Sequence, residues 1–171
     1  WSLMKLGMHK QIANRILEPW MWMTTILSGT DDAYANLYNL RVHPDAQPEF
    51  QELAWQMLQV HKKSVPKKLN PGEWHLPYIR PEEMTMYNVE TLLKLSTARC
   101  ARVSYLNHDG TSPSPDKDVK LHDMLAKAPH ASPFEHQATP CEFALTNFSG
   151  WDQYRKTLPN EYQTYHTGFN A

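Results

Sequence analysis

The spacing of apolar side chains predicts a helix at the start of the chain. Between residues 3 and 17 a methionine or isoleucine recurs at every fourth position, which places these side chains on one helical face. They are Met4, Met8, Ile12 and Ile16. Pro19 is expected to end this helix, because proline lacks the backbone N–H that a helix interior needs.

The next segments predict a strand and two more helices. Residues 21–27 are β-branched and aromatic enough for a short buried strand. A turn over residues 28–32 then starts a helix at about 32–41. Another helix, at about 47–62, begins with Pro48 and has one apolar face. That face comprises Phe50, Leu53, Ala54, Met57 and Leu58.

The second half of the chain predicts a small sheet among further helices. Residues 63–87 are rich in proline and should form an extended connection between two lobes. We expect a helix at 89–104 whose inward side chains are Leu92, Leu93, Ala98 and Ala101. A short helix around 119–125, a helix start at Ser132 and a strand at 139–145 should follow. The fold class is therefore α+β, a mostly helical single domain with a small sheet.

Length and charge exclude several functions. The chain has 171 residues, a typical length for one domain, and 17 Lys and Arg residues against 18 Asp and Glu residues. With no basic block, binding to nucleic acid or to an anionic membrane is not expected, and no apolar run is long enough to span a bilayer. Two cysteines without a CxxC pair, and nine histidines without metal-ligand spacing, give no metal site. Because Trp1 lies directly inside a helical pattern, we expect the domain to be incomplete at its N-terminus.

Three groups of charged residues are candidates for chemistry. Arg15 lies in the last turn of the first helix, where a cation complements the helix dipole. Arg41 follows Tyr34 by seven residues on an apolar stripe, so its side chain must reach solvent, pair with a buried carboxylate or face a ligand anion. Arg99 and Arg102 share a helical face that is either solvated or lines an anion site.

The segment from His130 to His136 predicts a capped helix start. Ser132 and Glu135 have the spacing of a capping box, with Pro133 at the first helical position. The N-terminus of such a helix offers backbone N–H groups to a phosphate or a flavin oxygen.

Four blocks together resemble the flavin-dependent thymidylate synthases, in the permuted order of the phage-type branch. Residues 13–19 resemble the family's "AR..LP" segment, and residues 36–49 its "N…LR…AQ.E" helices. Residues 101–105 read ARVSY, and residues 130–136 resemble "H.SPFEH". The family's RHR signature has no good copy. Residues 153–161 keep the spacing of this signature in part, but Leu158 stands where a serine is expected. The signature has therefore either diverged at these residues or lies upstream of Trp1, and we favour the upstream position.

The resemblance implies a reaction and an assembly. The family converts dUMP to dTMP by reductive methylation, with carbon from methylenetetrahydrofolate and hydride from FAD that NADPH has reduced. No enzyme cysteine attacks the base. The resemblance also implies a homotetramer with sites shared between subunits, in the cytoplasm of a bacterium or a phage-infected cell.

The resemblance also assigns site residues. Arg41 would bind dUMP and favour ionisation at the pyrimidine N3, and is therefore assigned as a catalytic residue. His130, near the flavin ring, is the second assigned catalytic residue. Arg15 would also contact dUMP. The residues that would contact FAD are Thr30, Asn36, Ser104, Ser132, Glu135 and Arg155. Two alternatives stay open: flavin-dependent hydroxymethylation of dUMP, and a non-catalytic subunit that binds flavin or nucleotide.

Overall fold

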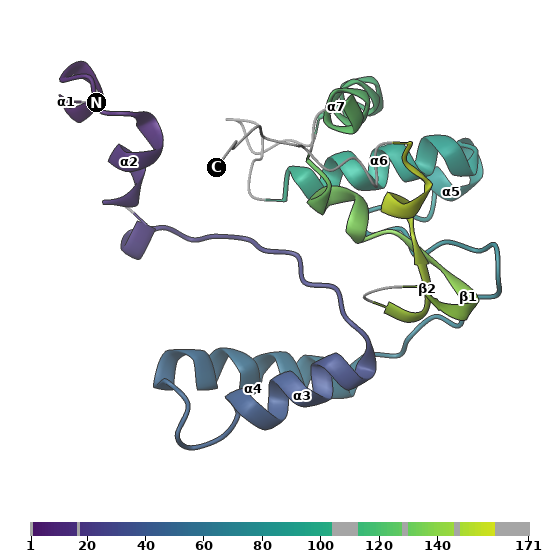
Figure 1. Ribbon diagram of the computed structural model, residues 1–171, viewed down its shortest axis with the longest axis horizontal. Coiled ribbons are helices and arrows are strands. Elements are labelled where there is room, and N and C mark those ends of the chain that lie inside the picture. Colours follow the sequence, from purple (N-terminus) through teal and green to yellow (C-terminus); the bar gives the residue numbers. More distant parts are fainter. Residues whose placement is uncertain (1, 17, 104–112, 128–129, 146–147, 160–171) are drawn as a thin grey trace, which may run out of the picture.

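The structure is a computed structural model, and it describes residues 2–16, 18–103, 113–127, 130–145 and 148–159 (Figure 1). Its helices are α1 (Ser2–Lys5), α2 (Lys10–Arg15), α3 (Asp31–Arg41), α4 (Pro48–Lys63), α5 (Glu83–Met86), α6 (Val89–Ala101) and α7 (Pro115–Lys127). Three 3₁₀ turns, η1 (Glu18–Trp20), η2 (Ser132–Glu135) and η3 (Tyr154–Thr157), and two strands, β1 (Ala138–Leu145) and β2 (Phe148–Gln153), complete the described elements. The described chain is mostly helical with a small sheet, which confirms the α+β class. None of its described helices has the length and hydrophobicity to cross a membrane.

The sheet is a single antiparallel pair within the described residues. Ala138 lies opposite Gln153, and Leu145 lies opposite Phe148. The register shifts between Pro140 and Ala144, opposite Gly150, whose φ of 82° favours glycine. The strand expected at 139–145 is confirmed as β1, whereas β2 was not predicted, because a glycine in its centre breaks the apolar alternation.

The best-packed part of the molecule is the body, which we define as the described residues from 64 to 159. Its centre is α6, which packs against α7 and η2. Asn88 caps α6 by accepting a hydrogen bond from the backbone N–H of Thr91 (2.9 Å). The core side chains along α6 and η2 are Leu92, Leu93, Leu95, Ala98, Cys100 and Phe134. The expected inward positions Leu92, Leu93 and Ala98 are thus confirmed, and burial raises the pKa of the Cys100 thiol to about 12.

A buried ionic network joins α5, α6 and α7. Asp118 is fully buried and accepts hydrogen bonds from Arg99 Nε (3.2 Å) and Arg102 Nη1 (2.7 Å). Arg99 also donates to both carboxylate oxygens of Glu83 (2.7 Å each) and to the carbonyl of Tyr78 (2.8 Å), whose φ is 61°. Both arginines therefore bind carboxylates of the protein itself, and neither alternative from the sequence, a solvated face or an anion site, describes them.

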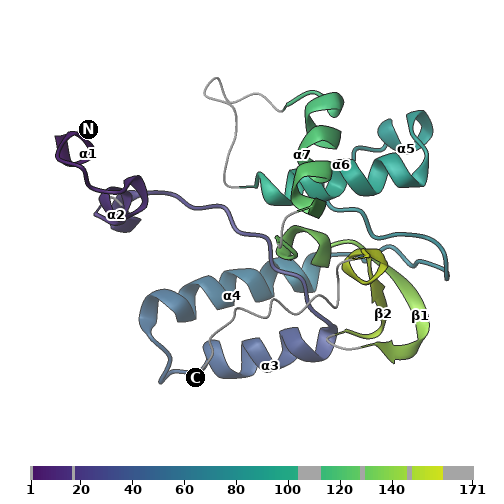
Figure 2. The same ribbon diagram turned by 45° about the horizontal axis from the view of Figure 1, so that its top comes forward.

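The α3–α4 hairpin, residues 31–63, lies beside the body (Figure 2). Tyr38 packs inside it and shares a hydrogen bond with His61 Nδ1 (3.1 Å). Ala54 is buried, but Phe50 and Leu53 are 44% and 51% exposed. The two helices were predicted correctly, whereas the apolar face expected on α4 is covered only in part.

The N-terminal segment, residues 2–27, forms an arm that extends away from the hairpin and the body in both views (Figures 1 and 2). The single helix expected over residues 3–17 is wrong: Gly7, with a φ of 83°, separates α1 from α2. The strand expected at 21–27 is also wrong, because no other strand among the residues that the structure describes lies beside this segment to share its hydrogen bonds.

The segment that joins the hairpin to the body is largely irregular, as its prolines indicate. Residues 64–82 contain neither helix nor strand, apart from a bridge between His75 and Ala138 that extends the sheet by one residue. The helical turn α5 falls at the end of the range that was expected to be wholly extended.

Replacement of Glu83 by Gln should make the protein less sensitive to acid. Hydrogen bonds from Arg99 hold the pKa of Glu83 well below its usual range, so the charged carboxylate stabilises the fold above the unfolded-state pKa of about 4.3. This stabilisation is lost as the pH falls from about 5 toward the folded-state pKa. Urea unfolding between pH 7 and pH 3 should therefore show a smaller loss of unfolding free energy for Glu83→Gln than for the wild type, with Glu82→Gln as an exposed control. Equal slopes for all three proteins would contradict the assignment.

Candidate functional site

Two segments that lie far apart in the sequence meet at η2 and η3. The Gln153 side chain donates to the backbone carbonyl of Glu135 (2.8 Å), and the backbone N–H of Tyr154 donates to the carbonyl of Gln137 (2.9 Å). Arg155 Nη1 forms an ion pair with Glu135 Oε1. The structure therefore joins Glu135 and Arg155, two of the residues expected to contact a cofactor, through their charged side chains.

The root of the arm reaches the same turn. Ser28 Oγ and His136 Nδ1 lie 2.9 Å apart, a hydrogen bond between residues 108 positions apart. Tyr34 donates its hydroxyl hydrogen to the carbonyl of Leu27 (2.9 Å), and Thr30 caps α3 by accepting from Ala33 N–H (3.3 Å). Thr30 is thus positioned two residues from the contact with His136.

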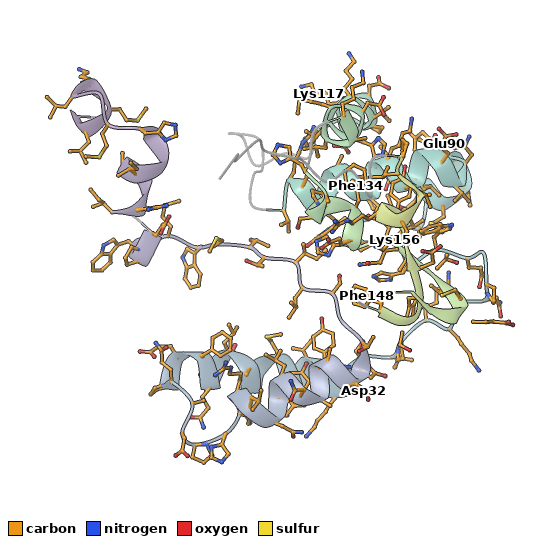
Figure 3. All side chains as sticks on the ribbon, viewed as in Figure 1. Asp32, Glu90, Lys117, Phe134, Phe148 and Lys156 are labelled. Carbon is orange, nitrogen blue, oxygen red and sulfur yellow. The ribbon has the colours of Figure 1, made fainter. Side chains whose placement is uncertain are left out.

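An aromatic cluster under η2 fixes these groups in place. Phe134 is fully buried, and its ring lies against the rings of His122 and Tyr154, with centroids 5.2 and 5.8 Å away. His122 Nε2 hydrogen bonds to the Tyr154 hydroxyl (3.1 Å), while its Nδ1 lies 2.9 Å from Asp123 Oδ1. Figure 3 shows Phe134 among the side chains of the body and Lys156 nearby. Because Tyr154 directly precedes Arg155, this cluster also sets the position of the guanidinium.

Burial lowers the pKa of two imidazole groups in this region, those of His122 and His136. Removal from water lowers the pKa of His136, and the neighbouring His75 lowers it further, against the opposing effect of Glu135. Burial also lowers the pKa of His122 and raises the pKa of Tyr154. The site therefore combines the His136 imidazole and the Ser28 hydroxyl with one carboxylate–guanidinium pair, a set that can form hydrogen bonds with a polar ligand.

The capping box expected at Ser132 and Glu135 is wrong. The N-cap of η2 is Ala131, and no side chain caps this turn. Glu135 turns instead toward Arg155, because the guanidinium offers a charged partner that the backbone N–H cannot match. A four-residue 3₁₀ turn also lacks the aligned N–H groups and dipole of a helix N-terminus, so the anion site expected there is absent.

Other expected site residues lie at the edge of this region or far from it. His130 and Ser132 are exposed on the segment that enters η2. Arg15 and Asn36 are exposed on α2 and α3. Arg41 lies at the far end of α3, about 15 Å along the helix from Thr30, with its guanidinium 5.4 Å from the centre of the Phe50 ring. Ser104 lies outside the described residues.

Sequence reasoning missed the polar residues that support the site. Asp118 and His122 are buried, as are Gln137 and Gln153. A signal for the first two was present, because Asp118, His122 and Leu125 follow the spacing of one helical face. No comparable pattern marks Gln137 or Gln153, whose side chains are buried against Ser96 of α6 and the backbone carbonyl of Glu135, respectively.

Across the described residues, no three His, Cys, Asp or Glu side chains come close enough to hold a metal ion. The chain matches no protein-family model, no curated protein and no solved structure. The resemblance of its sequence blocks to a flavoenzyme family therefore has to be tested by experiment.

Proposed function

We propose that the protein is a flavin-dependent thymidylate synthase that converts dUMP to dTMP, with FAD as cofactor and with methylenetetrahydrofolate and NADPH as co-substrates. The observation that carries the proposal is the meeting of three segments whose residues resemble flavin contacts of that family. Thr30 lies near the root of the arm, Glu135 ends η2 and Arg155 lies in η3, and hydrogen bonds or ion pairs tie all three segments together.

The side chains at this turn fit a flavin nucleotide chemically. Arg155 supplies a fixed cation for a diphosphate or an electron-rich ring edge, and Ser132 supplies an exposed hydroxyl. Glu135 accepts hydrogen bonds, as ribityl hydroxyls require, and it orients Arg155. When bound, FAD would supply the hydride for the reductive step. His130, exposed beside Ser132, would border the ring.

In the same proposal, Arg15 and Arg41 hold the anionic substrate. A guanidinium at the pyrimidine edge favours loss of the N3 proton, because its positive charge is retained at every physiological pH. Both arginines are exposed, Arg15 at the end of α2 and Arg41 at the end of α3 that lies opposite Thr30. The proposal therefore includes a homotetramer in which neighbouring copies bring these arginines to the flavin, in a cytoplasmic enzyme.

Titration with FAD tests the proposal directly on this chain. Flavin fluorescence should be quenched on binding, and dUMP should strengthen the quenching. Glu135→Ala should weaken FAD binding by about 10-fold or more, because it removes a charged hydrogen-bond partner and leaves Arg155 unoriented. Glu142→Ala, an exposed change on β1, is the matched control and should bind as the wild type does. Unaltered FAD affinity in folded Glu135→Ala would refute the assigned site.

A further inference from the structure

The arm presents an apolar surface that nothing in the described chain covers. The four residues that were expected to form a helical stripe, Met4, Met8, Ile12 and Ile16, are all exposed. Six further large apolar side chains of the arm are exposed as well: Leu6, Trp20, Met21, Trp22, Met23 and Leu27. Trp22 is fully exposed and Trp20 is 85% exposed. Large tryptophans in open solvent, side by side with methionines, are typical of a surface made for a partner.

The apolar area of the arm is sufficient for a stable protein interface. A stable interface buries about 800 Å² on each partner, and one aromatic side chain contributes about 150–250 Å². Trp20 and Trp22 thus account for about half of the buried area that each partner needs, and the exposed methionines, leucines and isoleucines supply the rest.

The α3–α4 hairpin offers a complementary surface. Phe50, Leu53 and Val60 share one face of α4 and are 44%, 51% and 70% exposed. The hairpin, residues 31–63, has five carboxylates against three basic side chains, a net charge of two negative. The arm, residues 2–27, has Lys5, Lys10 and Arg15 against Glu18, a net charge of two positive.

We propose that the arm of one chain docks on the α3–α4 hairpin of a second copy of the same chain. Apolar side chains of the arm cover the exposed face around Phe50 and Leu53, and the opposite net charges select this pairing. The contact is intermolecular, because the arm extends away from its own hairpin in both views (Figures 1 and 2). The bonds of Ser28 to His136 and of Tyr34 to Leu27 hold the root of the arm in that direction.

This inference does not depend on the proposed chemistry. It rests on exposed side chains and net charges, so it stands if FAD does not bind. A chain that binds FAD but stays monomeric would refute the arm–hairpin pairing and the homotetramer of the proposed function, and would leave the assigned flavin contacts standing.

Charge reversal on each side tests the pairing. Lys5→Glu with Lys10→Glu makes the arm negative, and Glu49→Lys with Glu52→Lys makes the hairpin positive. In sedimentation velocity, each double variant alone should associate at least about 10-fold more weakly than the wild type, because like charges then face each other. In an equimolar mixture, each arm meets a hairpin of opposite charge, and association should recover. A mixture as weak as its components would overturn the pairing.

Removal of the apolar contact provides an independent test. Trp20→Ser with Trp22→Ser should weaken self-association by about 30-fold or more, as expected for central aromatic residues of an interface. Met84→Ser, a change of an exposed apolar residue on α5, is the control and should associate as the wild type does. A wild-type chain that stays monomeric up to high micromolar concentration would overturn the proposal, as would tryptophan variants that associate normally.

Discussion

Asp118→Ala is expected to lower the free energy of unfolding by about 3–5 kcal/mol, the range for removal of one partner from a buried charge pair. The carboxylate is fully buried and binds Arg99 and Arg102, whose side chains are mostly buried too. Without it, Arg102 keeps a hydrogen bond to the carbonyl of Lys117 (3.0 Å) but loses its carboxylate partner. The substitution also leaves a space between α6 and α7, the two helices that form the centre of the body.

Urea unfolding followed by circular dichroism measures this loss. Asp116→Ala is the matched control, because Asp116 lies on the same helical turn and is exposed, so it should change the unfolding free energy by no more than about 0.5 kcal/mol. If Asp118→Ala were as mild as Asp116→Ala, the network would contribute nothing to the packing of α7 on α6.

Arg41→Ala should reduce dUMP turnover by about 100- to 1,000-fold, the cost of losing one charged group that stabilises a developing anion. The fold should remain intact, since Arg41 is exposed and stacks only partly on Phe50 within the described structure. Arg41→Lys should recover little of the activity, because an ammonium group lacks the planar pair of donors.

Mass spectrometry of the nucleotide product measures this effect and identifies the reaction. The assay uses dUMP, methylenetetrahydrofolate, NADPH and FAD with catalytically competent protein. Lys62→Ala, which removes an exposed cation from α4, should turn over dUMP at the wild-type rate. Wild-type turnover by Arg41→Ala would remove its assigned role, and a product that is only hydroxymethylated would favour that alternative reaction.

Helices α3, α4 and α6 could be predicted from local sequence. Proline at the start of α4, the asparagine cap of α6 and the apolar spacing of α3, α4 and α6 are signals that act within a few residues. The predictions failed where the signal depended on a distant partner. Residues 21–27 have the composition of a strand, but no strand of the described chain lies beside them.

For the candidate site, too, local sequence identified residues but not their distant partners. The family resemblance singled out Thr30, Glu135 and Arg155, of which only Glu135 lies in a matching block, and the structure brings their segments together. The same reasoning gave Glu135 the wrong partner, because a capping box is a local pattern and Arg155 lies 20 residues away.

The sequence by itself determined the class of the fold, helices α3, α4 and α6, and the residues to examine for chemistry. It did so because capping, proline placement and helical period act over a few residues. Only the tertiary structure decided that Arg99 and Arg102 bind Asp118, that Glu135 binds Arg155, and that the apolar stripe of the arm is exposed. These contacts depend on which surfaces meet when the chain folds. The sequence around a charged or apolar side chain has the same local pattern whether the partner of that side chain is water, a carboxylate or a second copy of the protein.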